Sequence, residues 1–205
     1  MDLALWRERI VYQGGLLALS TFLTSAALVL ANRATVSAIE QAAQDDLKQS
    51  LTQVLPEGMA DNDLLADALE VADTGGRKVN VYRGRKAGQF SAAVFEYRAR
   101  GYAGDIVILL GVDPAGAVTG VRVLRHSETP GLGDKIEAAK SDWIHAFEQK
   151  SLAGMPLASW AVKKDGGVFD QFAGATITPR AVVKAVREGL QFYAAHQAEI
   201  SEAAR

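Results

Sequence analysis

The strongest chemical signal in the sequence is the stretch DQFAGATITPR at residues 170–180. Thr178 followed by Pro179 is a typical helix start, because the hydroxyl can cap the helix and proline fits its first turn. Thr176 lies two residues before that expected cap, within the positive field of the helix N-terminus. Unpaired N–H groups at such an end favour anions such as phosphate, so the hydroxyl of Thr176 is a candidate site for a phosphate-bearing group.

The residues before this threonine are small, and one is acidic. Gly174 and Ala175 leave room for a bulky group or for an approaching enzyme. Asp170 stands six residues before Thr176, where its carboxylate could bind a metal or polarise a donor during a modification reaction. The alternative is an ordinary turn in front of a capped helix, for which Thr178 alone would account. From the residues alone, both interpretations stay open.

A second candidate loop is HSETPGLGDK, residues 126–135. Its proline fixes a sharp loop after an expected strand, and Gly131 and Gly133 let the backbone approach another surface closely. The spacing matches neither a GxGxxG motif nor a P-loop. His126 and Glu128 have no identified nucleophile beside them, so we predict no catalytic dyad. A simple connection from a strand to a helix is the alternative.

The composition excludes several classes of chemistry. The chain has no cysteine, which rules out disulfides, thiolate nucleophiles, iron–sulfur clusters and cysteine zinc sites. Its three histidines show no HxxxH or HExxH spacing, so we predict no metal site. The net charge of −2 gives no electrostatic support for binding nucleic acid.

An uncharged stretch of 22 residues, 10–31, predicts a transmembrane anchor. As a helix it would be roughly 33 Å long, and the hydrocarbon core of a bilayer is about 30 Å thick. Arg7 and Arg9 precede it, so the positive-inside rule places residues 1–9 in the cytoplasm and the C-terminal body outside. The alternative is a cleaved signal peptide, but the apolar run exceeds the usual length of about 7–15 residues.

The rest of the chain predicts one α+β domain after the anchor. Apolar spacing favours a helix over 32–55 that continues the anchor, and a second, short helix over 61–73. Further on, the patterns predict, in order, a hairpin within 78–102, a hairpin at 104–125, a helix within 135–152, a short strand and turn within 160–174, and a closing helix from Pro179 to about Ala195. The predicted parts are a cytoplasmic tail (1–9), an anchor (10–31), a helical membrane-proximal segment (32–79), and a mixed helix and antiparallel-sheet domain (80–205).

The stretch DQFAGATIT resembles the flavinylation motif D-x-x-[ST]-G-A-T of FMN-binding domains. GYAGDIVILLGVD, HSETPGLGDKI and DWIHAF occur in the order and at the separations expected for such domains. With its single N-terminal span, the chain resembles the family of G subunits of Rnf electron transport complexes. It is similar, more distantly, to the C subunits of the sodium-pumping NADH:quinone reductase. The resemblance covers the anchor and roughly residues 80–195, and its one departure is Ala173, where the family usually has serine or threonine.

The resemblance implies that FMN is attached through a phosphoester to the last threonine of the motif, here Thr176. A separate magnesium-dependent flavin transferase would perform the attachment, with FAD as the donor. The implied cofactor-binding residues come from the motif and from the second loop: Asp170, Gly174, Ala175, Thr176 and Thr178, together with Glu128, Thr129, Pro130, Gly131, Leu132 and Gly133. Leu132 could flank the flavin ring, and so could Trp143, for which we favour a core position on a helix face.

By the same resemblance, the chain relays electrons through the covalently bound FMN and is not a stand-alone enzyme. Its complex would couple ferredoxin and NAD oxidoreduction to ion translocation in the bacterial inner membrane, with the C-terminal domain on the periplasmic side. The implied partners are other membrane subunits, the lipid bilayer and, during maturation, the flavin transferase. Three alternatives stay open: the C subunit of a Na⁺-translocating NADH:quinone reductase, a membrane-anchored scaffold without a redox cofactor, and a complex that keeps a redox-sensing transcription factor reduced.

Overall fold

The computed structural model describes residues 10–202, and the chain divides into two compact units, 1–46 and 47–205. The predicted tail, residues 1–9, lies outside the described residues. Helix α2 (Ile10–Gln53) contains the described part of the first unit and the start of the second. The prediction that the anchor helix continues into the following segment is therefore confirmed.

The N-terminal part of α2 is a candidate membrane span. The helix is long and apolar enough to cross a membrane, and its most apolar window is not buried against any described part of the chain. Ser20 Oγ and Thr21 Oγ1 donate to the Leu17 carbonyl at 2.9 and 2.8 Å. Such bonds satisfy polar groups that lipid cannot satisfy. The hydroxyls in the span are therefore compatible with a membrane anchor.

Five antiparallel strands form the sheet of the second unit, in the order β1-β2-β3-β4-β5. Their bounds are β1 Ala68–Ala72, β2 Lys78–Lys86, β3 Gln89–Arg100, β4 Asp105–Val112 and β5 Val118–Arg125. Both predicted hairpins are confirmed, as β2–β3 and β4–β5. Ala87 and Gly88 turn the first hairpin with φ of 50° and 78°, a backbone region that favours glycine.

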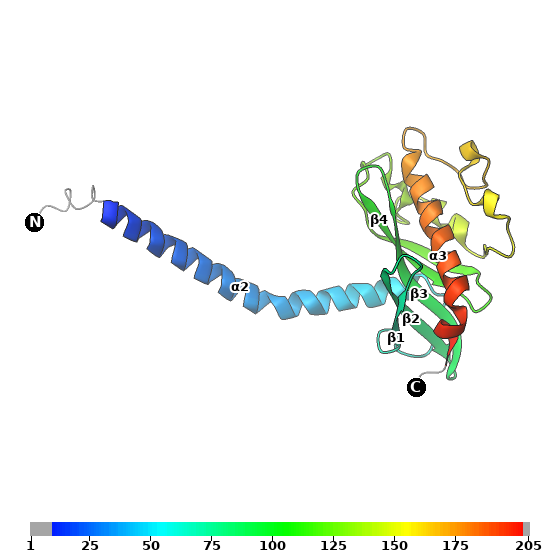
Figure 1. Cartoon of the computed structure of the whole chain (residues 1–205), viewed down its shortest axis with the longest axis horizontal. Coiled ribbons are helices and arrows are strands. Elements are labelled where there is room, and N and C mark those ends of the chain that lie inside the picture. Colours follow the sequence, from blue (N-terminus) through cyan, green and yellow to red (C-terminus); the bar gives the residue numbers. More distant parts are fainter. Residues whose placement is uncertain (1–9, 203–205) are drawn as a thin grey trace, which may run out of the picture. The chain divides into compact units, whose positions relative to one another are not determined.

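Helix α3 (Ile177–Ser201) packs on one face of this sheet, mainly against β3 and β4 (Figure 1). Gly189 allows the close approach, because a Cβ there would lie 2.8 Å from Leu110 Cδ2. Phe192 packs edge to face on Phe95, with 5.3 Å between the ring centroids. The main core thus lies between α3 and the sheet.

The other face of the sheet is covered by the last turn of α2 and the loop that follows it. Leu51 and Val54 are buried in one cluster with Leu109 of β4. Thr119 Oγ1 donates to the Val54 carbonyl at 2.8 Å, and a Cβ on Gly120 would lie 2.8 Å from the Val54 backbone. Because the antiparallel sheet packs against α3 on one face and against the end of α2 and its following loop on the other, the predicted α+β class is confirmed.

Residues 61–73 form a loop followed by β1, so the predicted helix there is wrong. The Asn62 side chain instead binds the backbone of β2, since Nδ2 donates to the Arg83 carbonyl at 2.9 Å and Oδ1 accepts from the Arg85 N–H at 2.7 Å. β1 then pairs with β2. These long-range contacts override the local helical spacing. The segment 32–79, predicted to be helical, is therefore helical only as far as the end of α2. The boundaries of the four predicted parts stay predictions.

The predicted helix within 135–152 is also wrong, because two short 3₁₀ helices occupy this segment. They are η1 (Asp134–Ile136) and η2 (Asp142–Phe147). Ser141 separates them with an extended backbone (φ −164°, ψ 150°), and its Oγ accepts from the Trp143 N–H at 3.0 Å. A serine that caps a new turn in this way cannot continue a helix.

The segment between η2 and α3 contains little regular structure. The predicted short strand within 160–174 is reduced to one parallel bridge between Val162 and Phe169. Two further 3₁₀ turns, η3 (Leu157–Ser159) and η4 (Lys163–Asp165), lie before and within it. The closing helix is confirmed, and it extends beyond the predicted end.

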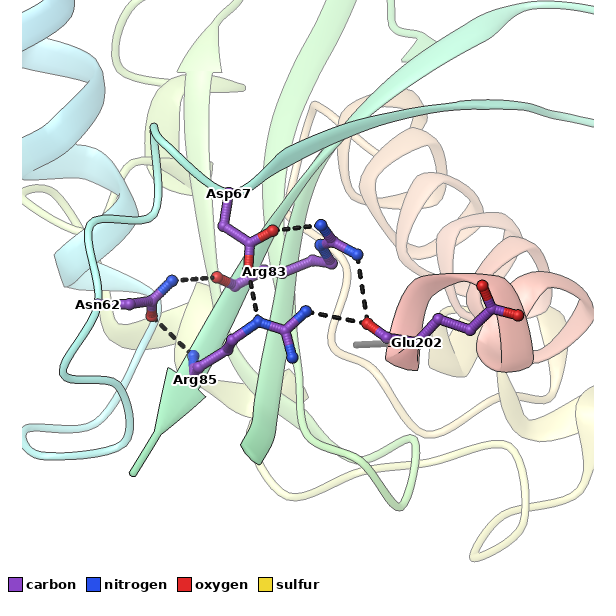
Figure 2. Close-up of polar contacts among 5 residues, drawn as sticks. All are labelled: Asn62, Asp67, Arg83, Arg85 and Glu202. Carbon is purple, nitrogen blue, oxygen red and sulfur yellow. Dashed lines mark hydrogen bonds and ion pairs between the residues drawn. The ribbon is translucent and has the colours of Figure 1, made fainter. Parts of the chain in front are cut away.

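A polar cluster joins the loop after α2 to strand β2 and to the end of α3 (Figure 2). Asp67 contacts Arg83 through one oxygen and lies 2.6 Å from Arg85 Nε through the other. Both guanidinium groups also donate to the carbonyl of Glu202, the C-cap of α3. Positive charge is favourable at a helix C-terminus, and Asp67 shares its negative charge between the two largely buried guanidinium groups, which leaves one net positive charge at this helix end.

Asp67→Asn should therefore destabilise the second unit. The substitution leaves two guanidinium groups without their counter-charge, which costs about 3 kcal/mol, or about 6–12 °C in Tm for a chain of this size. Thermal unfolding of the detergent-solubilised chain, followed by circular dichroism, measures this. Glu57→Gln removes the same charge from an exposed position in the same loop and serves as the control. Equal Tm values for both variants would contradict the role given to Asp67.

Candidate functional site

A pocket of about 230 Å³ lies at the N-terminus of α3. Its walls come from the turn between β3 and β4, the loop after β5, and the segment that precedes α3. The lining residues are Tyr102, Glu128, Thr129, Leu132, Gly133, Gly174, Ala175, Thr176, Ile177 and Thr178. The two loops that the sequence singles out therefore meet at one site.

Thr176, not Thr178, is the N-cap residue of α3, so the predicted cap is wrong by two residues. The Thr176 side chain makes no capping hydrogen bond within the described chain, and the residue is only partly buried. Thr178 lies inside the helix, is 1% exposed, and donates its hydroxyl to Glu128 Oε2. The hydroxyl of Thr176 is thus left available beside the unpaired N–H groups of the first turn.

Glu128 links the three walls of the pocket. Its side chain is buried, with 4% of the residue exposed. Oε1 accepts from the backbone N–H groups of Tyr102 at 2.9 Å and Ala103 at 3.1 Å, while Oε2 accepts from Thr178. The sequence predicts that Glu128 lines the cofactor. The structure adds a second role, because this carboxylate also joins the walls of the pocket to one another.

Two glycines make room for this arrangement. A Cβ on Gly101 would lie 2.5 Å from Glu128 Oε1, and a Cβ on Gly133 would lie 2.8 Å from Thr178 Oγ1. Opposite them, Gly174 has a φ of 79°, and a Cβ there would lie 3.6 Å from Leu132 Cδ2. The predicted close approach is confirmed at Gly133, which lies against the start of α3. At Gly131 it is not, because a Cβ there would have no atom within 4 Å, and this glycine instead turns the loop with a φ of 77°.

A charged network joins the loop to η1 and to the residues that follow it. His126 Nδ1 accepts from the Glu128 N–H at 3.1 Å, which leaves Nε2 to donate to Glu137 Oε1 at 3.0 Å. Lys140 Nζ lies 2.8 Å from both Glu137 Oε1 and Asp134 Oδ2. Its hydrogen bond is the main reason that the pKa of Asp134 and the pKa of Glu137 lie below their ordinary values.

The segment that precedes α3 is held by an aromatic cluster. Trp143 Nε1 donates to the Asp170 carbonyl at 2.8 Å, and the indole packs edge to face on Phe172 and Phe147. The Asp170 carboxylate is 68% exposed and lies 2.6 Å from Lys163 Nζ. Trp143 therefore packs among these rings, as we favoured, although it belongs to a 3₁₀ helix and does not line the pocket.

The structure brings most of the predicted site residues together. Among the predicted site residues, Asp170, Pro130 and Gly131 are the three that do not line the pocket. Tyr102 and Ile177 line it but were not predicted as site residues. Tyr102 belongs to the stretch GYAGDIVILLGVD, which the resemblance to FMN-binding domains had already singled out. The one sequence signal for a role in the pocket is its place next to Gly101 in the turn. Among the described residues, no group of three or more His, Asp or Glu side chains could hold a metal ion.

Gly133→Ala should destabilise the site, because the new methyl group would displace Thr178 or Glu128. Overpacking of this kind costs about 1–3 kcal/mol, and the measurement is the Tm of the full chain. Gly104→Ala is the matched control in the β3–β4 turn, since its Cβ would lie 3.6 Å from the Ser127 side chain, an ordinary contact. A Tm for Gly133→Ala as high as that of the control would show that the close approach is not required.

Lys140→Met should lower the Tm at neutral pH by removing the cation that Asp134 and Glu137 share. Both carboxyl pKa values are lowered, so this stabilisation is complete above their ordinary values of 3.8 and 4.5 and is lost as the pH falls through the lower folded-state values. The difference in Tm between wild type and variant should therefore be full at pH 7 and shrink below about pH 4. A difference that stays constant from pH 7 to pH 3 would contradict this assignment.

Comparison with known proteins places the pocket in a defined domain. The profile of the FMN-binding domain family matches residues 101–191, a range that contains every residue lining the pocket. The fold is similar to that of the crystal structure of Shewanella oneidensis NqrC, with a TM-score of 0.51 at 22% identity over 68% of this chain and 74% of that one. At this identity, the similarity concerns the fold alone.

Two curated relatives are much closer in sequence, and each is named as the G subunit of an ion-translocating oxidoreductase complex. The relative from Stutzerimonas stutzeri is 52% identical over 92% of this chain and 83% of its own length. The relative from Cereibacter sphaeroides is 45% identical over 95% of this chain and 89% of its own length. The chain therefore belongs to the family of ion-translocating oxidoreductase complex G subunits.

Proposed function

We propose that this chain is the FMN-carrying subunit of a membrane-bound, ion-translocating electron transport complex that couples ferredoxin and NAD oxidoreduction to ion movement. The main observation in support is the FMN-domain pocket at the start of α3, which lies in a chain that resembles the G subunits along most of its length. Bound FMN supplies the redox chemistry. The protein supplies its position, its exposure to solvent and the local electrostatics.

We further propose that the FMN is attached through a phosphoester to Thr176. Three features support this assignment. The hydroxyl of Thr176 makes no capping hydrogen bond, the N–H groups of the first helical turn lie beside it, and the small residues Gly174 and Ala175 precede it. A phosphodiester at this place would be stabilised by the partial positive charge of the helix end. Ala173 is the one departure from the motif, which has serine or threonine at this position. The residue is exposed, so the missing hydroxyl would have lain at the surface.

The pocket fits part of an FMN molecule. Pockets that enclose a whole drug-sized ligand measure about 300–1,000 Å³. The smaller volume here leaves some of the cofactor at the surface, beside the exposed apolar side chains of Tyr102, Leu132 and Ile177. A partly exposed flavin suits an electron carrier, because its ring must come close to the redox groups of partner subunits.

The proposed location is the bacterial inner membrane, with α2 as a single-pass anchor and the FMN domain on the periplasmic side. The basic residues before the span support this orientation. Within residues 10–31, Tyr12 is the single ionisable side chain, so we assign the ion path to other membrane subunits. The flavin transferase is a transient partner during maturation, and the lipid bilayer surrounds the anchor.

Thr176→Ala should abolish the covalent flavin. The experiment is coexpression of the full chain with a flavin transferase, followed by intact-mass analysis and in-gel flavin fluorescence after denaturation. We expect wild type to gain the mass of FMN less one water and Thr176→Ala to gain nothing. Thr129→Ala, which removes another exposed hydroxyl from the same pocket, is the control and should retain the adduct.

Two results would count against this proposal. An unmodified wild-type chain would favour a membrane-anchored scaffold without a redox cofactor. An adduct that survives in Thr176→Ala would place the linkage on another residue.

A further inference from the structure

Glu128 is a buried carboxylate without a basic partner. None of the ion pairs within residues 10–202 includes it. Its hydrogen-bond donors are the N–H groups of Tyr102 and Ala103 and the hydroxyl of Thr178, all of which are neutral. These donors and the nearby helix end stabilise a negative charge, but they do not cancel it.

The other carboxylates near this loop are different. Glu137 and Asp134 both pair with Lys140, and neither lines the pocket. Glu128 therefore provides the one uncompensated carboxylate among the residues that line the pocket.

We propose that Glu128 is a positioning residue whose charge also lowers the reduction potential of the flavin. This inference rests on the proposed binding of FMN in the pocket. A fixed negative charge opposes the arrival of an electron in the same site, because the two charges repel each other. At an effective dielectric constant of about 20, one charge at a distance of about 10 Å changes such an equilibrium about tenfold. The carboxylate thus favours release of electrons to a partner.

Glu128→Gln separates the two roles of this side chain. The amide has nearly the same shape, and its oxygen can accept from the N–H groups of Tyr102 and Ala103. Its NH₂ group can donate to Thr178, whose hydroxyl is free to rotate. The links between the walls are thereby kept while the charge is removed, so a purely structural role predicts an unchanged potential.

The test is a spectroelectrochemical titration of the full chain, purified after coexpression with a flavin transferase. For Glu128→Gln we expect the one-electron reduction equilibrium to shift about tenfold towards the reduced flavin, which is a rise of about 59 mV. Glu137→Gln is the matched control, because it removes the same charge from a carboxylate that Lys140 compensates outside the pocket. A shift for Glu128→Gln no larger than that of Glu137→Gln, or a shift downwards, overturns the inference.

Thr178→Val provides a second variant, with an effect of opposite sign. It removes one donor from Glu128, so more of the negative charge is left uncompensated and the potential should fall. If Glu128→Gln does not fold, Thr178→Val tests the inference alone, and an unchanged or higher reduction potential of this variant overturns it.

A wild-type chain without any flavin would instead contradict the proposed function, so failure of the inference and failure of the proposed function are distinguishable.

Discussion

The arrangement of the pocket depends on one side chain, the carboxylate of Glu128. It accepts hydrogen bonds from the turn between β3 and β4 and from the hydroxyl of Thr178 at the start of α3. Since Glu128 itself belongs to the loop after β5, segments far apart in the sequence meet at two oxygen atoms. Leaving the buried hydroxyl of Thr178 unpaired would cost about 1–3 kcal/mol. The close approach also requires glycine at 101 and 133, where a Cβ would contact Glu128 or Thr178 at 2.5–2.9 Å.

The scaffold fixes α3 at both ends, and this explains how the helix can present an anion site. At its N-terminus, Thr178 binds Glu128, and at its C-terminus Arg83 and Arg85 donate to the carbonyl of Glu202. Between these ends the helix packs on the central strands of the sheet. A helix held in this way keeps its free N–H groups and the hydroxyl of Thr176 in one place, so little order has to be gained when a phosphate group binds.

Features with local signals could be predicted from the sequence. Strand alternation and turn residues indicated both hairpins, and the DQFAGATIT motif indicated the segment that lines the pocket. Features that depend on distant contacts could not be predicted. Residues 61–73 have helical spacing, but Asn62 and β1 bond to β2 instead. Thr178 looks like a cap in the sequence, and only the folded chain shows that its hydroxyl is used by a glutamate 50 residues away.

The central claim is that FMN is held through a phosphoester to Thr176 at the start of α3, and phosphorus NMR of the flavin-loaded chain tests it most directly. A phosphodiester carries one charge throughout the physiological range, so its signal should not move between pH 5 and 8. A phosphomonoester has a second pKa near about 6, and its signal would move with pH. A non-titrating phosphorus signal that is lost together with Thr176 is the predicted result. A signal that titrates near pH 6 would show that the FMN is bound without the ester and would contradict the account.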